Sequence, residues 1–256
     1  MEDLDGPRAV PGAAADILAT LASFELVSDE PVLYQSTRAA DYHAALDLLA
    51  ARGLAYRCRC ARSEIHGPYD GRCRDLAITD ADSAWRLRLD ADATLAFEDR
   101  IQGHVEFTAA GVGDPVLMRR DGLAAYQLAV VVDDAFQGIT HVVRGADLLD
   151  STAWQIAIAQ ALGLQVPDFA HVPLLTEPAG QKLAKSRRSL PIAGMQPAPL
   201  LSAVLALLGL PLTSELKAAP VSDILHWAVQ HWRPQVMAGI RVVPLPMGSQ
   251  LARGQG

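Results

Sequence analysis

Residues 125–149 have the sequence AYQLAVVVDDAFQGITHVVRGADLL. An apolar segment ends in two aspartates, Gln137-Gly138 predicts a turn, and an extended segment then reaches Arg144 directly before a helix. Ligand crevices of open α/β sheets lie beyond the carboxyl ends of the strands, so we expect Arg144 at such a crevice. Its guanidinium can bind a carboxylate through two parallel hydrogen bonds, and Tyr126 can line the same site with its ring and hydroxyl. Taken singly, Tyr126 has the alternative of a core tyrosine and Arg144 that of a surface ion pair.

A second informative segment is QKLAKSRR, residues 181–188, which follows an apolar run and the turn signal Glu177-Pro178-Ala179-Gly180. Lys182 and Lys185 lie three positions apart beside a serine and two arginines. Ammonium groups on such a loop can stabilise the negative charge of a polyphosphate in a transition state. The alternative is a solvated basic loop.

The three cysteines, Cys58, Cys60 and Cys73, fall within one short segment. Gly-Pro and Asp-Gly turns between them predict that Cys73 returns towards the other two. Three thiolates at one point favour a soft cation, and zinc is the simplest choice. The alternative is three reduced, partly buried thiols, since an odd number without an export signal argues against a disulfide framework. On ligand chemistry alone, His66 is the better fourth ligand.

These segments resemble the class I aminoacyl-tRNA synthetases of the glutamyl type, and especially the glutamyl-queuosine tRNA(Asp) synthetases, from position 1 to about 240. Residues 181–188 resemble the KMSKS signature loop, with Ala184 where methionine or serine is most common. The resemblance implies an α/β fold with a Rossmann-like class I catalytic domain, a small β-rich zinc-bearing insert and a short C-terminal helical region. It implies that Lys182 and Lys185 act in catalysis, with Lys185 the direct ATP contact.

The resemblance also implies the remaining site residues. Glutamate would be bound by Glu2, which would hold its α-amino group, and by Tyr126 and Arg144. Structural zinc would be bound by a Cys-x-Cys and a Tyr-x-x-x-Cys sequence, which here supply Cys58, Cys60, Tyr69 and Cys73. His66 stays open as a rival to Tyr69.

The function implied is activation of L-glutamate with ATP and Mg²⁺, followed by transfer to queuosine in the anticodon of tRNA(Asp). The chain after residue 188 leaves no room for the anticodon-reading domain of full glutamyl-tRNA synthetases. One alternative is an inactive, truncated tRNA-binding remnant of the same family. Another is a nucleotidyltransferase that uses the same loop for a different carboxylate.

The first residues, Met1–Arg8, form an acidic cluster that resembles the segment following the first strand-helix unit in glutamyl-type synthetases. In those proteins a strand, a glycine loop and the HIGH-type ATP motif come before it, and no His-x-Gly-His or His-x-Gly-Ser sequence occurs in this chain. We therefore expect a chain cut short or translated from an internal start, with weak activity or none.

We predict a catalytic domain over residues 1–195, with an insert at about 54–122 and a zinc knuckle at 58–73. A helical region at 196–246 and a flexible tail at 247–256 would follow. The expected helices cover residues 13–24, a segment capped by Ser36 or Thr37 and ending at Arg52-Gly53, and 151–162, 199–208 and 221–231. We expect a turn at 96–99, a packed or capping rather than catalytic His171, and disorder from Pro244 onward.

Charge limits the way in which the chain can bind nucleic acid. The net charge is -7, which argues against binding through overall positive charge. Between positions 52 and 74, however, six arginines face two acidic residues, a local balance of +4 that suits tRNA phosphates or, equally, a solvated rim. Without a signal peptide or an apolar run that could span a bilayer, we expect a cytoplasmic monomer.

Overall fold

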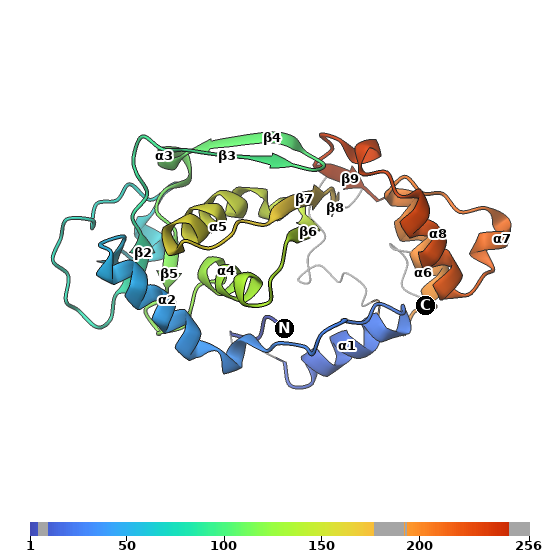
Figure 1. The fold of residues 1–256 in the computed structure, drawn as a ribbon, viewed down its shortest axis with the longest axis horizontal. Helices are drawn as coiled ribbons and strands as arrows, with labels where there is room; N and C mark the ends of the chain where they lie inside the picture. The colour runs from blue at the N-terminus through green and yellow to red at the C-terminus, as the bar shows by residue number, and fades with distance from the viewer. Residues whose placement is uncertain (5–9, 177–191, 193, 246–256) are drawn as a thin grey trace. The chain divides into compact units, whose positions relative to one another are not determined.

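The computed structural model describes residues 1–4, 10–176, 192 and 194–245 (Figure 1). The lysine loop with Lys182 and Lys185, and the predicted tail at 247–256, lie outside the described residues. The chain divides into one compact unit of residues 1–8, 33–99 and 103–170 and another of residues 9–32, 100–102 and 171–256. The predicted domain boundary at 195 stays a prediction. Among the described helices, none has both the length and the apolar character needed to cross a membrane.

The first unit combines helices with two sheets. Its helices are α2 (Ala39–Ala51), α3 (Ala109–Val112), α4 (Tyr126–Phe136) and α5 (Leu149–Leu162). One sheet has the order β1-β2-β5, with β1 (Ala55–Cys58), β2 (Ala84–Leu87) and β5 (Val116–Met118). The other has the order β4-β3-β7-β6, with β3 (Thr94–Asp99), β4 (Gly103–Thr108), β6 (His141–Gly145) and β7 (Asp168–Val172), which begins in this unit.

Helices α4 and α5 lie side by side and supply much of the core (Figure 1). Leu128 and Ala129 of α4 are fully buried, as are Ala153 and Ile158 of α5. The predicted helix at 151–162 is confirmed, and it ends at Gly163, whose φ of 75° is left-handed backbone that glycine adopts without strain. Because α5 connects β6 to β7, residues at the end of β6 face the first turns of α5.

The turn predicted at residues 96–99 is wrong. These residues belong to β3, which pairs antiparallel with β4, and the turn falls at 100–102 instead. The acidic pair Glu98-Asp99 resembles a turn sequence, but Asp99 is buried and pairs in parallel with Phe169 of β7. The predicted insert at 54–122 therefore contributes strands to both sheets.

The prediction that Ser36 or Thr37 caps the second helix is also wrong. Helix α2 begins at Ala39, and both hydroxyls have other partners. The Ser36 hydroxyl donates to the Asp3 carboxylate at 2.6 Å, and the Thr37 hydroxyl donates to the Tyr34 carbonyl at 2.7 Å. The N-cap position of α2 is Arg38, and no side chain of the described segments caps its first N–H groups.

The second unit contains α1 (Ala13–Ser23), α6 (Pro197–Leu207), α7 (Ser214–Lys217), α8 (Val221–His231), β8 (Leu174–Thr176) and β9 (Val242–Pro244). The predicted helices that correspond to α1, α6 and α8 are confirmed, and α6 and α8 bury a leucine-rich cluster between them. The prediction of disorder at Pro244 is wrong, because Pro244 is paired with Thr176 in the parallel pair of β8 and β9. Proline is tolerated there because β9 is an edge strand. His171 is fully buried, as predicted.

Candidate functional site

Two of the three predicted substrate residues, Tyr126 and Arg144, are in contact within the first unit. Arg144 is the penultimate residue of β6, and its Nη1 donates to the hydroxyl of Tyr126, the first residue of α4, at 3.4 Å. Burial raises the pKa of Tyr126, and the charge of Glu2 adds to this effect. Burial lowers the pKa of Arg144, while the charge of Glu2 acts in the opposite direction. The charge of Glu2 thus acts on both groups.

Helix α5 holds the guanidinium of Arg144. Nη2 donates to the hydroxyl of Thr152 at 2.8 Å and to Oε1 of Gln155 at 2.6 Å. Thr152 and Gln155 are buried and lie one helical turn apart. Since Nη2 carries two hydrogens, these acceptors satisfy both and fix the plane of the guanidinium. Sequence reasoning missed Thr152 and Gln155, although two polar residues three apart in an apolar helix were a signal.

Asp134 lies beside this site. It lines a pocket of about 20 Å³ that Gln155 and Phe169 also line, room for about one water. Burial raises the pKa of Asp134 to about 6, against the attraction of Arg144, and the charge of Asp133 adds to the rise. Its carboxylate is therefore close to half-protonated near that pH.

The three cysteines converge, as predicted. Their Sγ atoms all lie within 4.8 Å of one another, and those of Cys60 and Cys73 are 3.6 Å apart. The Tyr69 hydroxyl lies 3.3 Å from the Sγ of Cys58 and 3.7 Å from that of Cys60. Tetrahedral zinc with ordinary bond lengths places two sulfurs about 3.8 Å apart and a sulfur and an oxygen about 3.5 Å apart. The donor set is thus compatible with zinc.

The pKa of Cys58 shifts in the opposite direction to the pKa values of Cys60 and Tyr69. Burial opposes ionisation of Cys58, but hydrogen bonds from Tyr69, from the Cys60 N–H and from Arg86 outweigh it and lower the pKa of the Cys58 thiol. Burial raises the pKa of Cys60 and that of Tyr69. His66 is exposed and does not belong to the group of metal-ligating side chains found among the described residues.

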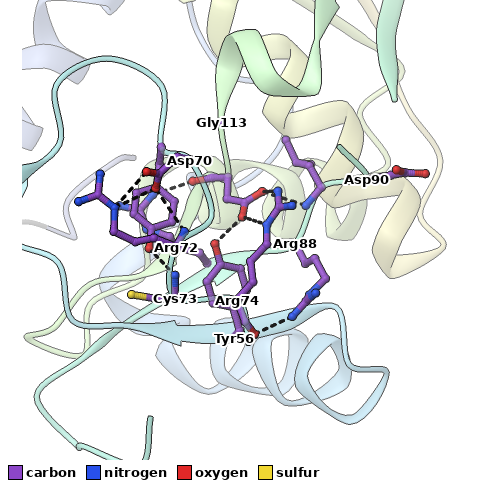
Figure 2. Close-up of polar contacts among 12 residues, drawn as sticks. Tyr56, Asp70, Arg72, Cys73, Arg74, Arg88, Asp90 and Gly113 are labelled. Atoms are coloured by element: carbon purple, nitrogen blue, oxygen red, sulfur yellow. Dashed lines mark hydrogen bonds and ion pairs between the residues drawn. The ribbon is translucent and has the colours of Figure 1, made fainter. Parts of the chain in front are cut away.

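The buried carboxylate of Asp114 connects residues at both ends of the knuckle. Asp114 accepts two hydrogen bonds from Arg74, from Nε at 2.7 Å and from Nη2 at 2.6 Å, and a further one from the Tyr56 hydroxyl. Figure 2 shows Tyr56 and Arg74 converging next to Cys73. Tyr56 precedes Cys58 on β1 and Arg74 follows Cys73, so one side chain ties both ends of the cysteine segment together.

This network changes the interpretation of the local positive charge. The charge of Arg74 is balanced by Asp114 inside the protein, and Arg72 pairs with Asp70 at 2.9 Å. The Arg57 guanidinium lies 4.6 Å from the centroid of the Trp85 ring. Each of these three arginines therefore has a side-chain partner in the first unit, and Arg74, whose charge is balanced inside the protein, belongs neither to a tRNA-binding patch nor to a solvated rim.

Comparison with known proteins places this geometry in a family. The model of the catalytic domain of class I tRNA synthetases (E and Q) matches residues 1–196. The glutamyl-Q tRNA(Asp) synthetase of Pseudomonas fluorescens is 46% identical over 248 residues, which cover 95% of this chain and 83% of that protein. The protein of the same name from Thiobacillus denitrificans is 47% identical over 259 residues, which cover 96% of this chain and 85% of that protein. The chain belongs to the glutamyl-Q tRNA(Asp) synthetase family.

Solved structures confirm the fold expected of this family. The glutamate-tRNA synthetase of Elizabethkingia anophelis superposes with a TM-score of 0.77 at 21% sequence identity. The match covers 97% of this chain and 61% of the other, so the chain spans about 61% of the length of that synthetase. The predicted α/β class I catalytic fold is thereby confirmed, and members of this class use ATP with Mg²⁺. The roles of Glu2, Tyr126, Arg144, Lys182 and Lys185 stay predictions.

Proposed function

We propose that this chain activates L-glutamate with ATP and transfers the glutamyl group to queuosine in the anticodon of tRNA(Asp). The observation that carries the proposal is the contact between Arg144 and Tyr126, on both of which the charge of Glu2 acts, in a member of the glutamyl-Q tRNA(Asp) synthetase family. An arginine, a hydroxyl donor and a carboxylate at one place complement the carboxylates and the α-amino group of glutamate.

The chemistry has two steps. The α-carboxylate of glutamate attacks the α-phosphorus of ATP, forming glutamyl-adenylate and releasing pyrophosphate. A hydroxyl of queuosine then attacks the carbonyl carbon of the mixed anhydride, and AMP leaves. Neither step needs a protein nucleophile, so positioning and charge stabilisation dominate. Lys182 and Lys185 would stabilise the leaving pyrophosphate, with Lys185 the direct ATP contact and Mg²⁺ bound with the ATP.

Zinc would be held by Cys58, Cys60, Tyr69 and Cys73. The distances among their donor atoms support this ligand set. With four protein ligands no coordination position is left for substrate, so the metal would stabilise the knuckle and take no part in the reaction.

ATP–pyrophosphate exchange with each amino acid tests the activation step. We expect exchange with glutamate and with no other amino acid. Arg144→Lys should lower exchange about 100-fold, because lysine cannot form the bidentate pair. Arg119→Lys, an equally conservative change at an exposed arginine, should leave it unaltered. Exchange with another amino acid, or activity retained by Arg144→Lys, would contradict the proposal.

Transfer is tested with radiolabelled glutamate and tRNA(Asp) that either carries or lacks queuosine. We expect label only on the modified tRNA. A non-catalytic tRNA-binding protein would bind tRNA(Asp) without exchange or transfer. That alternative is not favoured, because relatives that are 46% and 47% identical along most of their length bear the name of the synthetase.

A further inference from the structure

A buried cation, Arg86, lies beside the cysteine cluster. Arg86 lies on β2 and is 8% exposed. Its Cζ lies 4.0 Å from the centroid of the Tyr69 ring, and its Nη1 donates to the carbonyl of Asp114 at 2.6 Å. Its Nε is buried and has no hydrogen-bond partner among the described residues. A buried donor without a partner costs free energy, so its retention needs a reason.

A carboxylate balances the charge of Arg74, but none among the described residues balances the charge of Arg86. Arg74 forms a bidentate pair with the Asp114 carboxylate, whereas Arg86 contacts only the backbone carbonyl of Asp114. Within the described part of the chain, no carboxylate lies within ion-pair distance of Arg86. An uncompensated buried cation is strongly unfavourable, which points to an anionic partner that this chain alone does not supply.

The proposed metal centre would supply that partner. Three thiolates and one phenolate around Zn²⁺ carry a net charge of -2 in a largely buried position. Arg86 is paired with Tyr56 in the antiparallel β1–β2 register, so its side chain lies on the same face of the sheet as that of Cys58. Its guanidinium lies over the ring of Tyr69. Groups that contact metal ligands in this way orient them and tune their affinity for the metal.

We propose that Arg86 is a positioning residue of the zinc site, whose guanidinium lies on the face of the Tyr69 ring and orients that ligand. It thereby balances the negative charge of the four-ligand centre. The inference rests on the proposed zinc site and adds to it a residue that does not bind the metal.

Zinc affinity, measured by competition with a chromophoric chelator, tests the role of Arg86. Arg86→Met keeps most of the volume and removes the charge, and it should weaken zinc binding about 10- to 100-fold. Arg86→Lys keeps the charge but loses the planar fork, so a smaller loss is expected. Arg88→Met is the matched control, because the Cζ of Arg88 lies 5.8 Å from the centroid of the Tyr56 ring and not over Tyr69. The zinc affinity of this variant should equal that of the wild type.

A double-mutant cycle separates this role from general support of the fold. In a Tyr69→Phe background the ring remains but the phenolate is lost, so Arg86→Met should cost less zinc affinity than in the wild type. Co²⁺ in place of zinc should show altered thiolate-to-metal charge-transfer bands in Arg86→Lys, which a purely structural residue would not cause. Far-UV circular dichroism of the metal-free proteins confirms that the variants fold.

Three results would overturn the inference in different ways. Unchanged zinc affinity in both Arg86 variants, with a wild type that binds zinc, would overturn the role of Arg86 alone. A wild type that binds neither zinc nor cobalt would overturn the metal site and the role of Arg86 together. Equal losses in the wild-type and Tyr69→Phe backgrounds would assign Arg86 to the fold and likewise exclude the proposal.

Discussion

The side-chain oxygen of Gln155 accepts a hydrogen bond from Nη2 of Arg144 at 2.6 Å. The orientation of this amide is fixed, because its Nε2 donates to Oε1 of Gln127 at 2.9 Å, and Gln127 in turn donates to the Ser151 hydroxyl at 3.2 Å. A chain of directed hydrogen bonds therefore connects α4, α5 and the arginine at the end of β6. A rigid helix, and not a loop, sets the direction in which the guanidinium faces a substrate.

This relationship predicts that Gln155 controls glutamate binding. Gln155→Met removes the acceptor, so Arg144 loses one of the two contacts that fix Nη2, and we expect roughly tenfold weaker glutamate binding by calorimetry. Gln155→Glu keeps an acceptor for Arg144 and should bind more tightly than Gln155→Met. Gln160→Met, on the exposed side of the same helix, is the control and should match the wild type. Equal affinity in the wild type and Gln155→Met would show that Thr152 suffices to hold Arg144.

The fourth metal ligand can be decided by two substitutions. We expect His66→Ala to retain about one zinc per chain, because His66 is exposed and outside the group of converging donors. Tyr69→Phe should weaken zinc binding and change the visible spectrum of the Co²⁺ form, because its hydroxyl lies 3.3 Å from Cys58 Sγ. Elemental analysis of protein purified without chelator gives the stoichiometry. Zinc lost from His66→Ala but retained by Tyr69→Phe would reverse the assignment.

Sequence reasoning could predict the parts of the site whose spacing is local. Cys58, Cys60 and Cys73 share one short segment, and its turn residues determine how the chain returns. Ligand chemistry alone favoured His66 as the fourth ligand, and Tyr69 was implied only by the family resemblance. The pair of Tyr126 and Arg144 could likewise be predicted, because a helix and a strand joined by a short turn bring them together. In these cases local chemistry and the fold require the same residues.

Contacts between distant segments could not be predicted in this way. Asp114 lies 40 positions from Arg74, and nothing near either residue in the sequence marks the pair. The acidic pair Glu98-Asp99 predicted a turn. The prediction is wrong because Asp99 is buried by pairing with β7, which lies far along the chain. Pro244 predicted disorder. This prediction is wrong because Pro244 pairs with β8, a strand that is equally distant in the sequence. Pairing across such separations overrides local propensity.

The role of Asp114 leads to a prediction about stability. Asp114→Asn removes the charge that balances Arg74 and leaves that guanidinium without its bidentate partner, so we expect a loss of about 3–5 kcal/mol in the free energy of unfolding. Urea denaturation followed by circular dichroism measures it. Asp75→Asn is the control, because Asp75 is 89% exposed and its ion pair with Arg88 should contribute at most about 1 kcal/mol. A loss at Asp114 no larger than that at Asp75 would contradict the bracing role.

The raised pKa of Asp134 predicts a pH-dependent stability. Burial raises this pKa from 3.8 to about 6 in the folded protein, so the folded state binds a proton more readily than the unfolded chain. The stability gained from protonation is complete below about pH 4 and is lost as the pH rises through 6. Asp134→Asn carries no charge at any pH, so its unfolding temperature should exceed that of the wild type at pH 8, and the excess should shrink towards pH 4.

Thermal unfolding at closely spaced pH values between 4 and 8 measures this difference. Asp134 is only partly buried, so solvent screening will keep the effect smaller than the pKa shift alone implies. Asp47→Asn, on the exposed face of α2, is the control. The difference between its unfolding temperature and that of the wild type should be the same at every pH between 4 and 8. If the excess stability of Asp134→Asn does not vary with pH, its cause is packing and not the ionisation of a buried carboxylate beside Arg144.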